Sequence, residues 1–439
     1  MSDRNRDDYF NLDNFDDSID SREYRRRQPN RRQTSYNSNP SYNRRRPSKR
    51  RNRTRTRNRI LIVVALVLVL ALIITLIVVA LKGCGGGNKT VTVSTEPKSK
   101  QTDIANDTPD ATEVPAGQGG DSLALDVFKK ANPTDNNSDG YEAGGIYVWN
   151  QTGFELFYGT DDGAEIYADT INTLADKLVG MNVYSLMIPN HTEMGLPERF
   201  STGGTVNTTS QADHIKHAYE KMDKTKVTPI NAYNYLSEHC NDYIYFNSDH
   251  HWTGLGSYYA YKAFADTLGM NALSLSDCTE MTIEGFTGSL TNNADGLKTD
   301  TVHYWHFPYS VSMEIHDEYG GVNNYDSPYF DGEAGGGLAY GVFIYGDNPL
   351  TVMKSASQNA ESGKRIAVVK ESYGNAFVPY LTQNYEEVHV VDMRSFKQIS
   401  TVDLASYCRQ NGITDVLFLN GVMSANNGDL LDDMEGLFQ

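Results

Sequence analysis

Two kinds of hydrophobic pattern divide the chain. One is an uninterrupted run from Ile60 to Leu81, 22 residues without a charge. At about 1.5 Å per residue, a helix of this length spans roughly 33 Å, enough to cross the hydrocarbon core of a bilayer. The other starts near residue 141 and consists of short apolar runs. Between them, residues 83–140 are rich in Gly, Thr, Ser, Pro and Asp, which predicts a flexible linker without a core of its own.

The segment 141–439 predicts a single α/β domain. Strand-like apolar runs are expected at 144–150, 153–159, 182–189, 242–246, 364–370, 387–393 and 414–420. Helical spacing is expected at 164–181, 211–222, 231–240, 253–269, 375–385 and 402–412. Residues 273–360 are polar and predict an irregular insertion. Strands alternating with helices favour a layered fold around a mostly parallel sheet, whose ligand site lies at the carboxyl ends of the strands.

The charge distribution orients the apolar run. Residues 1–59 hold 18 Lys and Arg against 8 Asp and Glu, whereas the whole chain has a formal charge of −17. Because a positively charged flank stays in the cytoplasm, residues 1–59 are predicted to be a disordered cytoplasmic tail and residues 60–82 a transmembrane signal anchor. The remainder is then extracellular on a single-pass cell-membrane protein. A cleaved signal peptide is the alternative, but "LKGCGGG" offers no small-residue cleavage site.

The basic tail and the cysteines add little chemistry. The arginine-rich tail is interpreted as a topology signal rather than a lipid-binding or nucleic-acid-binding arm, so no nucleic-acid partner is expected. The four cysteines show no CxxC or Cys/His spacing, which argues against a structural zinc site. Sparse cysteine also fits a bacterial exterior better than a disulfide-stapled module.

Two polar clusters follow predicted strands. Asp249, His250 and His251 come after the run 242–246 and directly before a helical pattern. Taken alone, this cluster predicts a metal site, part of a Ser/His/Asp site, or structural histidines. No other histidine pair has H-x-H or H-x-x-x-H spacing, so neither a metal nor a cofactor is expected. Ser372 follows the run 364–370, where a serine is either an exposed nucleophile or a helix N-cap.

Both clusters resemble blocks of one enzyme group. "YFNSDHHWTGLGSYYAYKAF" resembles the Asp/His block of SGNH/GDSL esterases, and "VVKESYGNAFVPYL" resembles their serine block. The Asp-x-His-Trp form is similar to that of alginate O-acetylation proteins and most directly resembles the DHHW family. As in the acetylation proteins, the order is permuted, with the Asp/His block first. The resemblance implies a three-layer α/β/α SGNH-hydrolase-like domain with a mostly parallel sheet.

The resemblance also implies roles for individual residues. Ser372 is the expected nucleophile, His251 the general base and Asp249 the acid that orients it. The expected oxyanion donors are the Ser372 backbone N–H and Asn420, with His250 structural and Trp252 a pocket wall. Two departures affect the oxyanion hole: Lys370-Glu371 replaces the usual Gly-Asp pair before the serine, and only Asn420-Gly421 stands where a G-x-N-D block is expected.

The function implied is O-acetylation of a cell-envelope or exported polysaccharide through an acetyl-serine intermediate. The implied partner is an integral-membrane acyltransferase that supplies acetyl groups. The aromatic stretch "HYWHFPY" at 303–309 either stacks on sugar rings or packs the insertion onto the core. Two alternatives stay open: an acetyl esterase acting on the same substrates, and a catalytically silent polysaccharide-binding or assembly module.

Overall fold

The computed structural model describes residues 122–439 except 203, 333 and 334. The predicted tail, signal anchor and most of the predicted linker lie outside this range. Within the described part of the chain, no helix is both long enough and apolar enough to span a bilayer. The topology predicted for residues 1–82 therefore stays a prediction.

The domain is built on an eight-stranded mixed sheet in the order β5-β4-β13-β11-β12-β10-β8-β9. The first five strands run parallel, and the last three are antiparallel to their neighbours. The bounds in sheet order are Val227–Pro229, Asn182–Ile188, Asp415–Gly421, Glu361–Lys370, Tyr385–Asp392, Leu350–Ser355, Val311–His316 and Val322–Tyr325. Two smaller sheets consist of β1 (Tyr141–Ala143), β2 (Ile146–Trp149) and β3 (Thr152–Glu155), and of β6 (Thr279–Phe286) and β7 (Asp300–His306).

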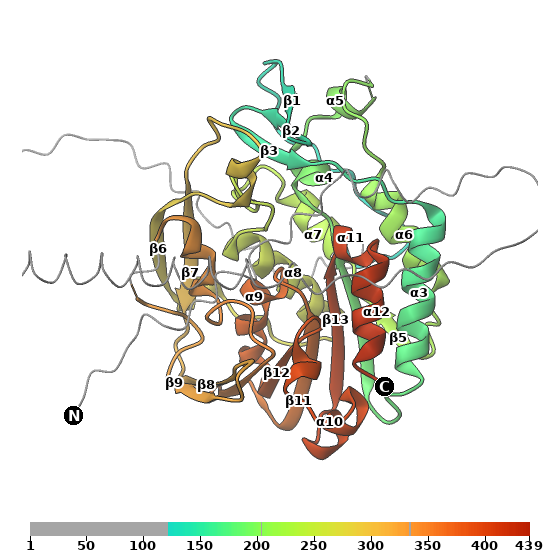
Figure 1. The fold of residues 1–439 in the computed structure, drawn as a ribbon, viewed down its shortest axis with the longest axis vertical. Coiled ribbons are helices and arrows are strands. Elements are labelled where there is room, and N and C mark those ends of the chain that lie inside the picture. Colours follow the sequence, from blue (N-terminus) through green and yellow to red (C-terminus); the bar gives the residue numbers. More distant parts are fainter. Residues whose placement is uncertain (1–121, 203, 333–334) are drawn as a thin grey trace, which may run out of the picture. The chain divides into compact units, whose positions relative to one another are not determined.

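Helices cover both faces of the parallel strands. Figure 1 shows α3 (Asp161–Ala175) and α12 (Gly428–Gly436) on one side, and α8 (Gly254–Thr267) and α9 (Gly374–Phe377) on the other. The remaining α-helices are α4 (His191–Gly195), α5 (Glu198–Thr202), α6 (Gln211–Lys221), α7 (Ala232–Glu238), α10 (Leu404–Gln410) and α11 (Val422–Ala425). The 3-10 helices are Leu275–Asp277, Ser289–Asn292, Gly336–Val342, Val378–Gln383 and Phe396–Gln398.

The mixed α/β class is confirmed, and burial explains why the sequence predicts it. Every residue of β13 is buried, and so are the last five residues of β11, as expected for strands covered on both faces. Helix starts carry side-chain caps: Thr160 accepts from the Gly163 N–H, and Thr253 accepts from the Gly256 N–H. Apolar runs and caps together therefore fix the parallel half of the sheet.

Two predictions about secondary structure are wrong. Residues 242–246 do not form a strand of the sheet; they make a single β-bridge, Tyr245 with Trp252. Residues 273–360 are not irregular, because they form β6 to β10, and β8 to β10 extend the main sheet. The antiparallel extension was missed because these strands are short, and β6, β8 and β9 expose part of their surface, so their hydrophobic signal is weak.

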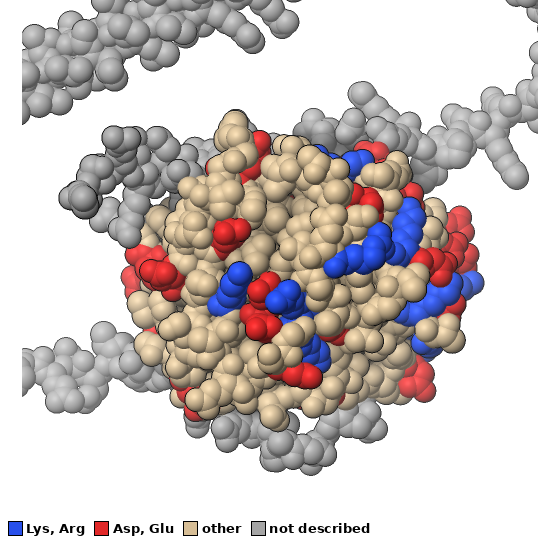
Figure 2. Space-filling model, turned by 90° about the horizontal axis from the view of Figure 1, so that it is seen from below, with Lys and Arg blue, Asp and Glu red and all other residues tan. Residues whose placement is uncertain are grey.

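The two ends of the parallel strands differ in character. Seen from below, where the parallel strands begin, the surface in Figure 2 carries Lys and Arg interspersed with Asp and Glu, without a field of one sign. Ser372 follows the other, carboxyl end of β11. The candidate site is therefore at the edge of the sheet where ligands of such folds bind.

Candidate active site

Ser372 lies in the short turn between β11 and α9. Its side chain is largely buried, and its Oγ lies 2.7 Å from Nε2 of His251. The turn is tight: Gly374 N–H donates to the Glu371 carbonyl and Asn375 N–H to the Ser372 carbonyl. The serine hydroxyl is thus held at hydrogen-bonding distance from an imidazole that comes from 121 residues earlier in the chain.

The Asp249–His251 loop is bent so that the acid reaches the ring. Asp249 Oδ1 accepts from the His251 backbone N–H at 3.0 Å and lies 2.6 Å from His251 Nδ1. A hydrogen bond from the N–H two residues later to an Asp side-chain oxygen is typical of an Asx-turn. The two ring nitrogens of His251 are consequently directed at Asp249 and Ser372, in the order that a Ser/His/Asp triad requires.

A nearby glycine brings helix α8 close to this loop. A Cβ on Gly256 would lie 2.2 Å from the Ile244 carbonyl oxygen, a distance that the backbone does not permit. Only glycine lets the first turn of α8 pack so closely against the preceding segment. The "TGLG" that follows the histidines therefore has a packing reason.

The insertion that the sequence left unassigned anchors the Asp/His loop. Asp300 of β7 accepts hydrogen bonds from the backbone N–H groups of Asn247 and Ser248 at 2.9 and 2.8 Å, and also from their side chains. The Ser289 N–H and hydroxyl donate to Asp249 Oδ2 at 2.9 and 3.1 Å. No motif signals Asp300 or Ser289, because their partners are more than 35 residues away in sequence.

The environment of Asp249 keeps it ionised. Burial alone would raise the pKa of this carboxyl, but the charges of His250 and His251 and the hydrogen bonds from His251 and Ser289 outweigh burial. The net effect holds the pKa of Asp249 well below its ordinary value. Asp249 is therefore a stable anion beside the imidazole.

Aromatic rings fix the orientation of His251. The Tyr340 ring stacks on the imidazole at 4.1 Å, and the Tyr340 hydroxyl donates to the Ser372 carbonyl at 3.1 Å. Trp252, expected as a pocket wall, is fully buried instead, and its indole N–H donates to the Tyr373 carbonyl at 2.9 Å. Trp252 thus ties the histidine loop to the serine turn from inside the core.

A cavity of about 210 Å³ opens beside the serine, lined by residues that include Glu155, Asn190, His250, Ser372 and Met423. His250, which is predicted to be structural, also lines this cavity. Its Nδ1 lies 2.8 Å from the Ser289 hydroxyl. Burial raises the pKa of Glu155, whose carboxyl has no hydrogen-bond partner among the described residues. Glu155 carries no sequence signal, since it is the last residue of an ordinary hairpin strand, β3.

The region of the expected oxyanion hole is occupied by Glu371. Its carboxylate accepts from the Tyr373 N–H at 2.9 Å and from the Gly421 N–H at 2.7 Å, and Oε2 lies 3.4 Å from Ser372 Oγ. Asn420 is buried, and its Oδ1 accepts a hydrogen bond from the Tyr167 hydroxyl at 3.2 Å. Its Nδ2 lies 3.6 Å from the Met393 sulfur. At the end of β13, the N–H nearest the serine turn is thus that of Gly421 rather than the side chain of Asn420.

A buried cluster of charged side chains lies at the end of β11, next to the serine turn. Lys370 is completely buried and lies 2.9 Å from both Asp347 and Asp392, and Arg394 also contacts both carboxylates. Burial by itself would lower the pKa of Lys370, but the two carboxylates raise it above its ordinary value. The two cations and two anions compensate each other, which accounts for a lysine at a position where the resemblance leads one to expect glycine.

The same loop also presents metal-ligating atoms. One ligand atom each of Asp249, His250 and His251 lies within 4.8 Å of the others, and no other such group occurs in the described ranges. Both nitrogens of His251, however, already face Asp249 and Ser372. A metal would have to displace one of these contacts, so the arrangement favours proton transfer over metal binding.

Comparison with known proteins gave a family match and solved structures of similar fold. The family model described as "DHHW protein" matches residues 118–391, which include Asp249, His251 and Ser372. A solved DHHW family protein from Eubacterium siraeum is 28% identical, with a TM-score of 0.59, covering 69% of this chain and 98% of its own.

A second solved structure has the same fold at lower identity. Bacillus cereus PatB1, solved with a sulfonyl adduct, is 20% identical, with a TM-score of 0.53, covering 65% of this chain and 96% of its own. A search among curated proteins gave no match.

Proposed function

This chain belongs to the DHHW family, and from that premise we propose that it is a membrane-anchored serine acyltransferase that O-acetylates a cell-envelope or exported polysaccharide. The observation that carries the proposal is the continuous series Ser372, His251 and Asp249, with contacts of 2.7 and 2.6 Å. A serine hydroxyl is a poor nucleophile until a base takes its proton, and this arrangement supplies the base and its orienting anion.

In the first half-reaction, Ser372 Oγ attacks the carbonyl carbon of an acetyl donor. Its proton passes to His251 Nε2 as the new C–O bond forms, and the carbonyl oxygen takes the negative charge in a tetrahedral intermediate. The bond to the donor's leaving group then breaks as the carbonyl forms again. His251 then returns the proton to that leaving group, and Ser372 is left as an acetyl ester. The negative charge on the carbonyl oxygen needs N–H donors. The backbone N–H of Ser372 remains the proposed donor, because the N–H groups of Tyr373 and Gly421 are bound by the Glu371 carboxylate.

In the second half-reaction, a sugar hydroxyl enters the cavity beside the acetylated serine. His251 Nε2 takes the proton of that hydroxyl, its oxygen attacks the acetyl carbon, and Ser372 Oγ leaves with the proton. Glu155 lines the same cavity, and its unpartnered carboxyl can bind a neighbouring sugar hydroxyl. Water in place of the sugar gives the esterase alternative with the same residues.

The test is covalent labelling of Ser372. After incubation of the full-length protein with p-nitrophenyl acetate, mass spectrometry of the peptide that contains Ser372 is expected to show the addition of one acetyl group. A sulfonyl fluoride is a second probe, because such reagents modify activated serine hydroxyls, and Ser372→Ala is the control for both. If the wild-type protein consumes no ester and takes up neither label, the domain is instead the silent binding module.

The proposal includes a location. The uncharged run at 60–81 and its basic flank support a single-pass anchor with residues 83–439 outside the cell, where an integral-membrane acyltransferase supplies acetyl groups. Protease added to intact cells is expected to cleave in the Gly/Ser/Thr-rich linker and to release the folded domain, while the cytoplasmic tail is protected. Resistance of the whole outer segment, with cleavage only after lysis, would place the domain inside.

A further inference from the structure

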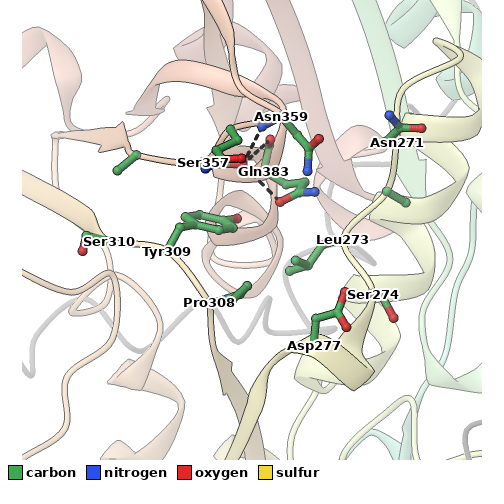
Figure 3. Close-up of a pocket in the computed structure, with 13 residues that line it drawn as sticks. Asn271, Leu273, Ser274, Asp277, Pro308, Tyr309, Ser310, Ser357, Asn359 and Gln383 are labelled. Carbon is green, nitrogen blue, oxygen red and sulfur yellow. Dashed lines mark hydrogen bonds between the residues drawn. The ribbon is translucent and has the colours of Figure 1, made fainter.

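A larger cavity lies away from the triad. It has a volume of about 610 Å³, within the usual range for small-molecule sites of about 300–1,000 Å³. It is formed by four separate segments: the chain after α8, the residues just before β8, the link between β10 and β11, and Gln383 at the end of the 3-10 helix Val378–Gln383. Figure 3 shows Tyr309 on one side of it, with Asn271, Ser274 and Asp277 on the other.

The lining is polar but almost uncharged. Besides two alanines, Leu273 and Pro308, the lining consists of amides, hydroxyls and the Tyr309 ring. Asp277 is its single carboxylic acid, and it contains no Lys, Arg or His. Such a wall attracts neither phosphate nor other anions. Amides offer both donors and acceptors, which suits a neutral ligand dense in hydroxyl groups.

Several of these groups are available to a ligand. The side chains of Asn271, Asp277, Gln358 and Asn359 make no hydrogen bond within the described part of the chain. Gln358 and Asn359 are exposed, so they are not packed into the core. The cavity therefore presents unused hydrogen-bonding capacity from two opposite sides.

The floor beneath these groups is fixed. The Ser357 hydroxyl donates to the Gln383 carbonyl at 3.1 Å and accepts from the Asn359 N–H at 3.1 Å. The Tyr309 ring stacks on Phe307 at 5.4 Å, and its hydroxyl lies 3.2 Å from that of Thr382. The floor of the site therefore needs little rearrangement when a ligand binds.

The aromatic stretch 303–309 is resolved into two roles by the structure. Tyr304 and Trp305 are buried and pack the insertion, whereas Tyr309 lines the cavity. An aromatic ring with an apolar face and a fixed hydroxyl suits contact with the apolar face of a sugar ring. Packing of the insertion onto the core therefore explains Tyr304 and Trp305, whereas Tyr309 is the aromatic residue that can contact a ligand.

The cavity lies at the opposite end of the sheet from the serine. Gln383 precedes the start of β12, whereas Asp392 at its end pairs with Lys370, two residues before Ser372. At about 3.3 Å per residue, β12 separates the two places by roughly 20–25 Å. A ligand in this cavity is thus not the group that reacts at Ser372.

We propose that this cavity is a second saccharide-binding site, which holds a neutral stretch of the polysaccharide at a distance from the hydroxyl that is acylated. The proposal rests on the proposed function for the identity of the polymer. Binding energy from such a remote segment raises the local concentration of acceptor hydroxyls at the triad and favours transfer over hydrolysis.

The test separates binding from catalysis. Full-length Ser372→Ala protein in nanodiscs is titrated with cellotetraose and with chitotetraose by isothermal calorimetry, and saturable binding of at least one is expected. Adding Gln358→Ala and Asn359→Ala removes two exposed amides, and loss of hydrogen bonds worth about 1 kcal/mol each predicts a fall in affinity of at least about tenfold. Gln410→Ala, an exposed amide on α10, is the matched control and should leave affinity unchanged.

Two results overturn the proposal: no saturable binding of either sugar at about 10 mM, a concentration that would detect even millimolar affinity, or binding that the Gln358/Asn359 double change leaves intact. Acetylation by p-nitrophenyl acetate of Gln358→Ala/Asn359→Ala protein that retains Ser372 tests the proposed function separately. It should match the wild-type rate, because that small ester does not reach the second cavity.

Discussion

His251→Ala is expected to lose acylation of Ser372 almost completely, whereas His250→Gln should keep about a fifth of the wild-type rate. In serine enzymes, loss of the base costs on the order of 10⁶ in rate. His251 is the histidine whose Nε2 lies 2.7 Å from Ser372 Oγ. His250 instead contacts Ser289, and loss of one such hydrogen bond costs about 1 kcal/mol, roughly fivefold. The measurement is the burst of p-nitrophenol from p-nitrophenyl acetate, with far-UV circular dichroism as the check on folding.

The same pair of variants distinguishes proton transfer from metal catalysis. A metal held by Asp249, His250 and His251 would make both histidine changes equally harmful, and a chelator would inactivate the wild-type protein. Under the triad, EDTA leaves the burst unchanged. Equal loss in both variants together with EDTA sensitivity would replace the triad by a metal site.

The parallel half of the fold was predictable because its signal is local. β4, β13 and the last five residues of β11 are buried and mostly apolar, and the helices between the strands show helical spacing and side-chain caps. Each of these features can be recognised within a window of about 20 residues or less. The positions of Ser372 and of the Asp/His pair before α8 could be recognised for the same reason.

The support of the site was not predictable, because it depends on distant contacts. Residues 242–246 look like a strand but form an ordered loop, which is held by hydrogen bonds from Tyr243, Asn247 and Ser248 to Asp300. An acid inside a polar insertion gives no sign that it will accept these bonds. Likewise, nothing in the sequence shows that Glu371 binds the N–H of Gly421, fifty residues later.

The sequence predicts that two parallel strands of one sheet bring the three triad residues together at their carboxyl ends, and the structure differs from this. Only Ser372 is delivered by a strand of the sheet. Asp249 and His251 are delivered by a loop that rests on β7 and on the Ser289 turn. The insertion is therefore a structural part of the site. Its removal would disturb the Asp/His loop more than it would disturb the parallel sheet.

Asp249→Asn is expected to fold but to lose on the order of 10⁴ in acylation rate, as in serine proteases in which the acid becomes an amide. Asp249 Oδ1 accepts from the N–H at His251 Nδ1, which leaves Nε2 free to take the serine proton. An amide in this place can donate to Nδ1 instead, so the proton moves to Nε2 and the base is lost. The burst assay measures the effect, and Ser289→Ala, which removes one of the two Ser289 bonds to Asp249 but keeps the backbone N–H, should cost at most about tenfold.

Stability against pH provides an independent readout for the same variant. Because the folded-state pKa of Asp249 lies well below its ordinary value of about 3.9, its ionised form stabilises the wild-type fold above that pH, and this contribution is lost as the pH falls further. Asp249→Asn lacks a titrating group there, so its urea midpoint should decline less between about pH 5 and pH 2. If the variant keeps more than a tenth of the acylation rate and the wild-type pH slope, Asp249 neither orients His251 nor carries the buried charge. Another acid that lines the cavity, Glu155 or Glu371, must then be considered.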